Sequence, residues 1–307
     1  MFPLIDADAL ARLLPMDAAI DALQEGFGAE RLPEAPMRSH VETVSGTLFL
    51  MPAHGGAGVG VKLVTLTDAN PARGLPFIHA IYVLFDAEAQ APQAVLDGTA
   101  LTALRTAAVS GLATRHLARP DAGRLVLFGA GVQARSHLRA MRAVRPIEEV
   151  VVVSRGRERA EALASEAGSL GLRASVGAPG AERDADLVCT CTTSTTPVLA
   201  GATLAEGVHV NAVGAYTTSM REVDTETVRR ARVVVEAREA AMAEAGDLLI
   251  AIEEGAVGAE HVLADLSEVV RGKPVRTSDG DVTLFKSVGV AFEDLIVARA
   301  AVDRWDP

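Results

Sequence analysis

Two glycines with informative spacing, Gly129 and Gly131, lie in the segment 129–134, which reads Gly-Ala-Gly-Val-Gln-Ala. A short apolar run at 124–128 precedes this segment, and apolar residues at three-residue steps follow it from Leu138 onward. This order predicts a strand, a tight turn and a helix. In such a turn Gly129 permits the bend, Gly131 lets the backbone approach a pyrophosphate, and the helix N-terminus receives the anion. The segment therefore predicts a dinucleotide site.

The end of the next predicted strand, residues 149–153, suggests which dinucleotide is bound. Ser154, Arg155 and Arg157 follow that strand. A carboxylate at this point would bind the 2′-hydroxyl of the ribose and repel a 2′-phosphate, whereas serine and arginine can hold that phosphate. The pattern favours NADP(H), with NAD(H) as the alternative cofactor. A second interpretation is that the arginines only begin a solvated helix.

Two cations stand where the pattern calls for apolar residues. Lys62 interrupts the apolar strand 59–64, and a buried ammonium must be paired, neutralised or given an anionic ligand. The alternative is an edge-strand lysine that discourages aggregation. Arg105 lies four residues from both Leu101 and Val109, so it shares an apolar stripe of a predicted helix. Its alternative role is structural, paired with a carboxylate elsewhere in the chain.

Arg38, at the head of a predicted strand, would by itself be a surface residue. Together with Lys62 and Arg105 it could bind a small substrate that carries a carboxylate, because the arginine fork suits that group. Charge then assigns the roles. Arg38 and Arg105 would clamp the carboxylate, while Lys62 would help to hold it and move a proton.

No residue pattern indicates a metal. The histidines show no ligand spacing, and Cys189 and Cys191 lie two apart on one predicted strand, which makes a poor zinc site. The nucleophile-elbow pattern G-x-S-x-G is also missing from the sequence. We predict a site without metal.

The elements that must position these residues fall into two groups. The first is an α/β, Rossmann-type dinucleotide-binding domain at 120–287, because short β-branched runs alternate there with helical or loop segments. These runs are residues 124–128, 149–153, 186–192, 209–214 and 232–236. Residues 119–123 form the expected joint before this domain.

The second group is an α+β domain at 1–119, to which residues 288–307 return. Its expected elements are a helical segment at 3–29, a hairpin at 38–51, strands at 59–67 and 78–85, a long helix at 99–117 and a closing helix at 290–301. The strands predict a mostly antiparallel sheet. With the three cations on its elements, this domain would bind the substrate, and a cleft would separate it from the dinucleotide domain.

Composition limits the partners. The net charge of −11, from 29 basic and 40 acidic residues, opposes binding to nucleic acid or to an anionic membrane. No stretch approaches the length of a membrane span, and the N-terminus lacks a basic and apolar leader. We expect a cytoplasmic protein that acts on a small metabolite.

With these residues located, the chain resembles the ornithine cyclodeaminase/μ-crystallin family over nearly its whole length. The matching segments are residues 60–62, 97–108, 129–134, 195–198, 213–215, 220–222 and 285–289. The resemblance implies a Rossmann domain joined to a substrate-binding domain that forms a homodimer. It places the substrate carboxylate on Arg38, Lys62 and Arg105. It places the dinucleotide contacts on Thr106, Val132, Gln133, Ser154, Arg155, Thr192, Val213 and Ser287.

The sequence departs from the family pattern at Tyr216. Ornithine cyclodeaminases carry an aspartate in this segment, where it serves the ornithine amines. Tyr216 therefore favours the branch that reduces cyclic imines, and we expect NAD(P)H-dependent reduction of a Δ1-pyrroline-2-carboxylate or Δ1-piperideine-2-carboxylate. The alternatives are an alanine-type amino-acid dehydrogenase, an ornithine cyclodeaminase and a μ-crystallin-like binding protein without turnover.

Overall fold

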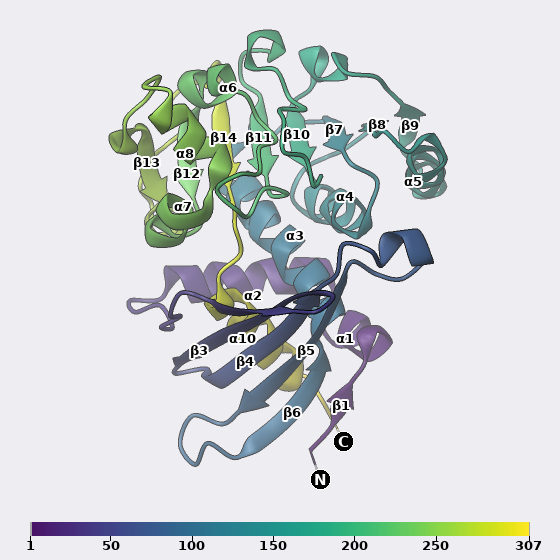
Figure 1. The fold of residues 1–307 in the computed structure, drawn as a ribbon. Coiled ribbons are helices and arrows are strands. Elements are labelled where there is room, and N and C mark those ends of the chain that lie inside the picture. The colour runs from purple at the N-terminus through teal and green to yellow at the C-terminus, as the bar shows by residue number, and fades with distance from the viewer. Residues whose placement is uncertain (1, 307) are drawn as a thin grey trace. The chain divides into compact units, whose positions relative to one another are not determined.

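The computed structural model describes residues 2–306, which form two compact units (Figure 1). Unit 1 contains the described residues up to Arg105 and those from Val290 onward, and unit 2 is Thr106–Gly289. The first boundary lies inside the helix α3 (Gly98–Leu117), earlier than the joint expected at 119–123. The reason is that the second half of α3 contributes buried residues, such as Ala108 and Leu112, to the core of unit 2.

Unit 1 is built on a six-stranded sheet, mostly antiparallel as expected, with one parallel pair between β1 and β6. Its strand order is β1 (Leu4–Ile5), β6 (Pro92–Asp97), β5 (Ile78–Phe85), β4 (Gly58–Leu66), β3 (Gly46–Gly55) and β2 (Ser39–Thr43). In this register Lys62 of β4 is opposite Met51 of β3 on one side and Tyr82 of β5 on the other.

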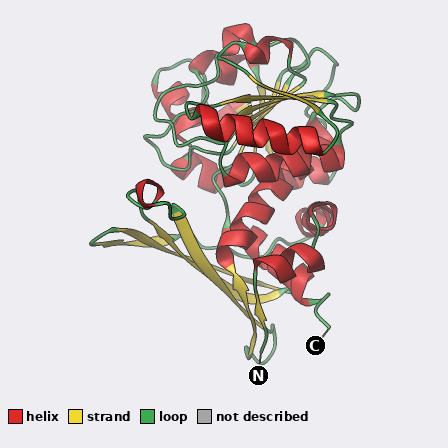
Figure 2. Ribbon diagram, turned by 90° about the vertical axis from the view of Figure 1, so that its right-hand side faces the viewer, coloured by secondary structure: helices red, strands yellow, loops and turns green. Residues whose placement is uncertain are grey.

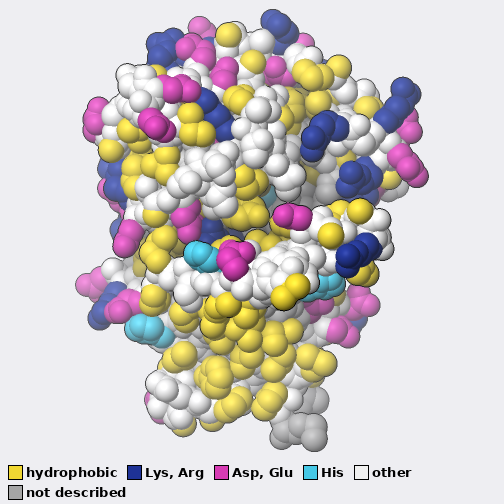
Figure 3. Space-filling view, viewed as in Figure 1, with side chains coloured by type: hydrophobic (Ala, Val, Ile, Leu, Met, Phe, Trp, Pro, Cys, Tyr) yellow, Lys and Arg dark blue, Asp and Glu magenta, His cyan; other side chains and the backbone are white. Residues whose placement is uncertain are grey.

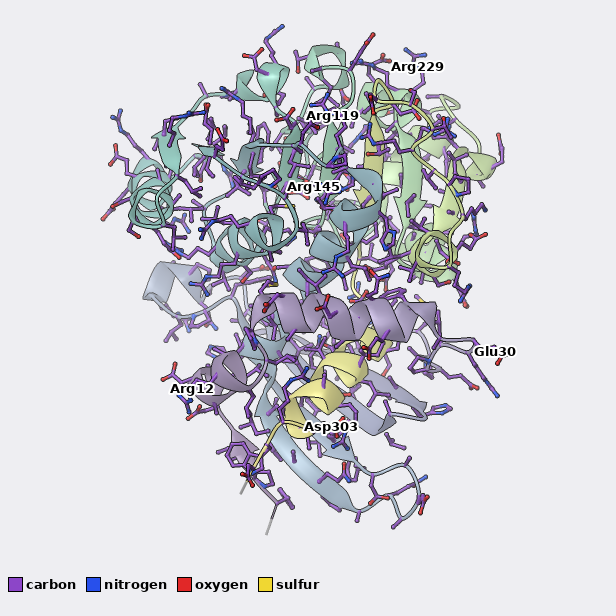
Figure 4. All side chains as sticks on the ribbon, turned by 180° about the vertical axis from the view of Figure 1, so that it is seen from behind. Arg12, Glu30, Arg119, Arg145, Arg229 and Asp303 are labelled. Atoms are coloured by element: carbon purple, nitrogen blue, oxygen red, sulfur yellow. The ribbon has the colours of Figure 1, made fainter. Side chains whose placement is uncertain are left out.

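Helices from the N-terminal and C-terminal parts of the chain lie on one face of this sheet (Figures 2 and 4). They are α1 (Ala7–Leu13), α2 (Met16–Gly28) and α10 (Ala291–Val302); a 3₁₀ turn, η1 (Pro71–Arg73), interrupts the chain before β5. Phe27 of α2 meets Phe292 of α10 edge to face, with ring centroids 5.2 Å apart. In Figure 4 the labelled Asp303 marks the end of α10.

The prediction of a helical segment over 3–29 was partly wrong. Leu4–Ile5 pairs with β6 as a strand, and Pro15 separates α1 from α2 with an extended backbone (φ −61°, ψ 162°). Proline tolerates a position just before a helix because its missing N–H is not needed there. Apolar residues at helical spacing continued across this break, which is why the pattern looked uninterrupted.

The other face of the sheet in unit 1 carries apolar side chains, and among the described residues of this unit no α-helix covers it (Figures 2 and 3). Successive residues of a strand point to opposite faces. Leu63 and Ile81, next to Lys62 and Tyr82, therefore point away from α10. Figure 3 shows hydrophobic side chains gathered over these strands.

Unit 2 is an eight-stranded sheet in which all pairs are parallel, with helices on both faces (Figure 2). Its strand order is β13 (Val262–Asp265), β12 (Arg232–Val235), β14 (Thr283–Lys286), β11 (His209–Ala212), β10 (Leu187–Thr190), β7 (Arg124–Phe128), β8 (Glu149–Val153) and β9 (Arg173–Val176). The chain proceeds outward in one direction through β8 and β9, and in the other through β10 and β11. The expected α/β, Rossmann-type fold is confirmed.

The connections of unit 2 are mainly helical. They comprise α4 (Val132–Val144), α5 (Arg157–Ser169), α6 (Thr225–Arg230), α7 (Arg238–Glu244), α8 (Gly246–Glu253), α9 (Leu266–Val270) and the 3₁₀ turns η2 (Ala181–Asp184), η3 (Gly201–Thr203) and η4 (Ala259–His261). Arg145, labelled in Figure 4, donates to the carbonyl oxygens of Thr114, Arg115 and Ala118 and so closes the C-terminal end of α3. Across residues 2–306, none of the helices combines the length and the apolar character needed to cross a membrane.

Candidate active site

Lys62 lies in the interior of unit 1. Its strand, β4, is bonded on both sides, so the interpretation as an edge-strand lysine is wrong. The ammonium Nζ lies 2.9 Å from Oδ1 and 2.8 Å from Oδ2 of Asp294, and only 1% of the residue is exposed. The buried charge is therefore paired, as the apolar surroundings require.

Arg105 reaches the same carboxylate from α3. Its Nε donates to Oδ1 of Asp294 at 3.2 Å, and its Nη1 donates to Oε2 of Glu293 at 2.9 Å. Both acids are fully buried in the first turn of α10, where the helix dipole favours negative charge. Two cations and two acids thus balance each other inside unit 1, and Arg105 is paired as its structural alternative anticipated.

This cluster changes the acidity of Lys62. Burial and, to a smaller extent, the positive charge of Arg105 lower the pKa of the ammonium, which is about 8 in the folded protein. The charge and hydrogen bonds of Asp294 oppose these effects. Lys62 therefore stays protonated at neutral pH, yet its pKa is close enough to neutrality for proton transfer.

Arg38 lies on the same face of the sheet as Lys62. Its guanidinium carbon is 5.4 Å from the centroid of the Phe49 ring, a cation–π distance. Phe49 is opposite Val64, which is two residues from Lys62 and therefore shares its face. The structure thus brings Lys62 and Arg105 to one carboxylate, and places Arg38 on the same face of the sheet.

Tyr82, which the sequence analysis did not single out, belongs to this cluster. It is fully buried opposite Lys62, and within the described residues its hydroxyl has no hydrogen-bond partner. A Cβ on Gly60 would lie 1.9 Å from that hydroxyl oxygen, so only glycine fits there. Burial, with a smaller contribution from the charge of Asp294, raises the pKa of Tyr82 well above its ordinary value. The hydroxyl is therefore a neutral donor.

The glycine-rich turn of unit 2 fits a dinucleotide. Gly129 has φ +107°, and a Cβ there would lie 2.5 Å from the carbonyl oxygen of Cys191. Gly131 faces open space, with no atom within 4 Å of an added Cβ, and α4 begins at the following residue, Val132. Oε1 of Gln133 is buried with no partner among the described residues. The turn thus offers backbone N–H groups at the start of α4 to a phosphate-linked ligand.

The turn after β8 carries more cations than we expected. Arg155 is exposed, whereas Arg157 is bonded through Nε to Glu161 at 2.7 Å. The guanidinium of Arg159 lies over the turn, with Nε 3.2 Å from where a Cβ on Gly156 would be. Among the described residues, Glu161 binds Arg157, and no acid binds Arg155.

The remaining residues expected to contact the cofactor lie in unit 2. Thr192, Val213 and Ser287 follow β10, β11 and β14, whose C-terminal ends share one edge of the parallel sheet. Thr106 is buried in α3. The carboxyl edge of such a sheet is where ligands bind.

No group of three histidine, cysteine, aspartate or glutamate side chains that could hold a metal ion occurs in the part of the chain that the structure describes.

Comparison with known protein families shows to which family the chain belongs. The model of the ornithine cyclodeaminase/mu-crystallin family matches residues 5–307. The chain belongs to this family. The resemblance stated from the sequence motifs is therefore confirmed.

Two reductases and a dehydrogenase are similar to this chain over nearly their whole length. The chain is 39% identical to a Δ1-pyrroline-2-carboxylate reductase of Bacillus cereus, covering 98% of this chain and 95% of the relative. The structure of Thermococcus litoralis Δ1-pyrroline-2-carboxylate reductase in complex with NADH and L-proline matches with a TM-score of 0.93 and 35% identity, covering 99% and 97% of the two chains. An archaeal alanine dehydrogenase dimer with bound NAD gives a TM-score of 0.93 and 33% identity, covering 99% and 95%.

The acids that hold the cations were not predicted from the sequence. Glu293 and Asp294 interrupt an otherwise apolar helical run, Ala291 to Val297, and this was the available signal. Tyr216 was singled out, and it lies half-buried in the segment after β11.

Proposed function

We propose that this protein reduces a small cyclic imine carboxylate of the Δ1-pyrroline-2-carboxylate or Δ1-piperideine-2-carboxylate type to the cyclic amino acid with NAD(P)H. One observation carries the proposal: Lys62 and Arg105, both buried, already converge on one carboxylate, that of Asp294, at hydrogen-bond distances. Relatives named Δ1-pyrroline-2-carboxylate reductase support the choice of substrate.

The residues of the cluster divide the work. Arg38 and Arg105 hold the substrate carboxylate, since guanidinium groups bind carboxylates in pairs of hydrogen bonds. Lys62 contributes positive charge to that carboxylate and donates a proton to the imine nitrogen. The pairing with Glu293 and Asp294 holds both cations in place before the substrate arrives, so little reorganisation is needed. When bound, the nicotinamide supplies the hydride.

The cofactor we propose is NADP(H), held at its adenosine end by Ser154 and Arg155. The absence of an acid among residues 154–157 and the exposure of Arg155 support this choice. Arg159, over the same turn, adds positive charge near a 2′-phosphate. Neighbouring structures that contain NADH or NAD make NAD(H) the alternative.

Tyr216 supports a preformed ring over a diamino acid as the substrate. Cyclisation of ornithine needs an acidic group near the second amine, both to orient it and to accept a proton. A phenol with an ordinary pKa of about 10 is a poor base at neutral pH and offers no negative charge. We therefore expect no conversion of ornithine to proline.

The test is a substrate panel followed through the absorbance of NADPH and NADH. We expect oxidation with pyrroline or piperideine carboxylates and none with ornithine plus oxidised cofactor. Release of ammonia from ornithine would overturn the assignment. Absence of turnover with every imine and 2-oxo acid would instead favour a binding protein of the μ-crystallin kind.

Alanine dehydrogenase is a second candidate, favoured by the structural similarity to an archaeal enzyme of that name. Lys62 would then act as acid and base while the imine forms from a 2-oxo acid and ammonia. Preference for these two substrates over cyclic imines would select this alternative. Its active-site residues would be the same.

We also propose a homodimer in the cytoplasm. The exposed apolar face of the sheet in unit 1, where Ile81 is 48% exposed, supports an interface, because monomers rarely expose large apolar patches. Light scattering should give a mass twice that of one chain. The variant Ile81→Glu should give the mass of a single chain. Val176→Glu, at an exposed position of unit 2, is the control.

The free thiols Cys189 and Cys191 suit a reducing compartment.

A further inference from the structure

Glu222 is a fully buried acid at the edge of unit 2 where the parallel strands end. Its Oε1 accepts from the backbone N–H of Thr192 at 2.6 Å and from the Thr192 hydroxyl at 2.7 Å. Its Oε2 accepts from the N–H of Gly214 at 2.6 Å and from the hydroxyl of Thr190 at 2.8 Å. One carboxylate thus joins the end of β10 to the segment after β11.

Two further buried charges hold this acid. Asp247 accepts from the backbone N–H groups of Glu222 at 2.6 Å and Val223 at 3.0 Å. Lys286 lies 2.9 Å from the other oxygen of Asp247 and donates to the carbonyl oxygens of Ala212 and Ala215 at 3.2 and 2.6 Å. The network therefore extends to the end of β14.

The segment after β11 has no room to adjust. A Cβ on Gly214 would lie 2.0 Å from the carbonyl oxygen of Thr192 and 2.6 Å from Oε1 of Glu222. The two loops are therefore packed against each other around the carboxylate. Displacing one of them requires displacing the other.

The strand order shows which half of a dinucleotide would meet these loops. The pyrophosphate-binding turn follows β7, and β8 and β10 lie on opposite sides of β7. The adenosine end belongs to the β8 side, at Ser154 and Arg155. The nicotinamide end must extend to the other side, toward the ends of β10, β11 and β14.

We propose that Glu222 is a positioning residue that fixes the loops after β10 and β11, so that the nicotinamide end of the cofactor is held in a single orientation. The inference deepens the proposed function and rests on it for the identity of the cofactor. Glu222 touches neither cofactor nor substrate in this role. It acts through the backbone of Thr192 and Gly214.

Glu222→Gln tests the proposal with almost no change of shape. Each carboxylate oxygen accepts one backbone N–H. The glutamine NH₂ must therefore face one of these two N–H groups. Because both groups are hydrogen-bond donors, no hydrogen bond forms between them. Either Thr192 or Gly214 loses its anchor.

A matched control is Glu182→Gln. Glu182 is also buried and accepts from a backbone N–H, that of Gly180 at 2.8 Å, and from a hydroxyl, that of Thr203 at 2.7 Å. It lies in η2, before the start of β10 and so away from the carboxyl edge. Thr190→Val is a milder second variant, because it removes a single donor from Glu222.

The first measurement needs no turnover. In the parent protein without ligand, hydrogen exchange of the peptides covering 191–195 and 213–216 is compared with that of both glutamine variants. We expect at least about tenfold faster exchange in both peptides for Glu222→Gln, a smaller change for Thr190→Val and none for Glu182→Gln. Unchanged exchange in Glu222→Gln would overturn the proposal.

The second measurement separates the two ends of the cofactor. Binding of 2′,5′-ADP and ADP-ribose, which lack the nicotinamide, should stay within about twofold of the parent in Glu222→Gln, while binding of NADPH or NADH weakens at least about fivefold. Equal weakening of fragment and whole cofactor would show a general structural role and reject the proposal. Turnover then adds a lowered kcat in the variant. If the parent binds cofactor but reduces no imine, the proposed function is refuted. The binding measurements would still test the positioning role of Glu222.

Discussion

Buried charges serve unit 1 and unit 2 in different ways. In unit 1, Lys62 and Arg105 are held by the side chains of Glu293 and Asp294. In unit 2, the acid Glu222 is held largely by backbone N–H groups and hydroxyls. Both clusters are removed from water, so both need complete pairing to be tolerated.

The difference lies in what a ligand could exchange. A substrate carboxylate resembles the carboxylate of Asp294, so it can share the donors that Lys62 and Arg105 present. Glu222, in contrast, accepts from the protein's own backbone at Thr192 and Gly214. The first cluster is suited to binding and proton transfer, and the second to holding loops in place.

The largest expected effect on turnover comes from removing the proposed proton donor. Lys62→Met should lower kcat by about 10²-fold or more, since general acid catalysis contributes about 10²–10⁴. Steady-state kinetics at pH 7 with a cyclic imine would measure it, and Lys273→Met, at a partly exposed position of unit 2, is the control. A kcat within about threefold of the parent would exclude Lys62 as the donor.

A smaller loss should follow from shortening the carboxylate clamp. Arg105→Ala should lower kcat/KM at least about tenfold through the lost contact with the substrate. It also leaves Glu293 buried without its cation, a change that typically destabilises by about 3–5 kcal/mol. Arg105→Lys keeps the charge without the fork and should recover stability more than kcat/KM. Equal recovery of both would mean that Arg105 has a structural role only.

The pH dependence sharpens the assignment of Lys62. If the protonated amine is the donor, kcat/KM should fall as the pH rises through about 8, the lowered pKa of Lys62. Asp294 raises this pKa, so Asp294→Asn should move the fall to lower pH, and Glu293→Gln should move it less. Turnover that is independent of pH from 7 to 10 would contradict the assignment.

Stability should change with pH in the opposite direction. Lys62 binds its proton less tightly in the folded chain than in the unfolded chain, where its pKa has the ordinary value of 10.5. Between about pH 8 and that value the unfolded chain holds more protons, so the contribution of Lys62 to stability increases with pH. Loss of activity above pH 8 should therefore not be accompanied by unfolding that originates at this residue.

Much of the fold was predictable because its signals are local. The turn at Gly129, the strand β5 and the helix around Arg105 each follow from residues that are close in the sequence. The first residues were harder, because Leu4–Ile5 becomes a strand only by pairing with β6, about ninety positions later. The unit boundary was also hidden, since α3 continues through it without any break in its helical pattern.

The cations of the site were predictable from the sequence, but the acids that pair with them were not. Lys62 and Arg105 were conspicuous because they interrupt apolar patterns, but their partner Asp294 lies 232 and 189 positions away. No local rule connects residues at such distances. Glu222 and Lys286 were noticed only as parts of matching segments. Their role depends on which strand ends lie side by side in the sheet, and the sequence does not give that order.

The smallest expected effect concerns the cofactor. Arg155 is exposed, and an exposed charge interaction contributes about 1 kcal/mol or less, about fivefold in affinity. We expect the parent to prefer NADPH over NADH by about this factor, and Arg155→Asp to erase or reverse the preference by placing negative charge against the 2′-phosphate. Arg157→Asp should change it less, because Arg157 is already bonded to Glu161. The ratio of kcat/KM for the two cofactors measures both variants. Equal use of NADPH and NADH by the parent, unchanged in Arg155→Asp, would remove Arg155 from the cofactor site and leave Arg159 as the other arginine beside that turn.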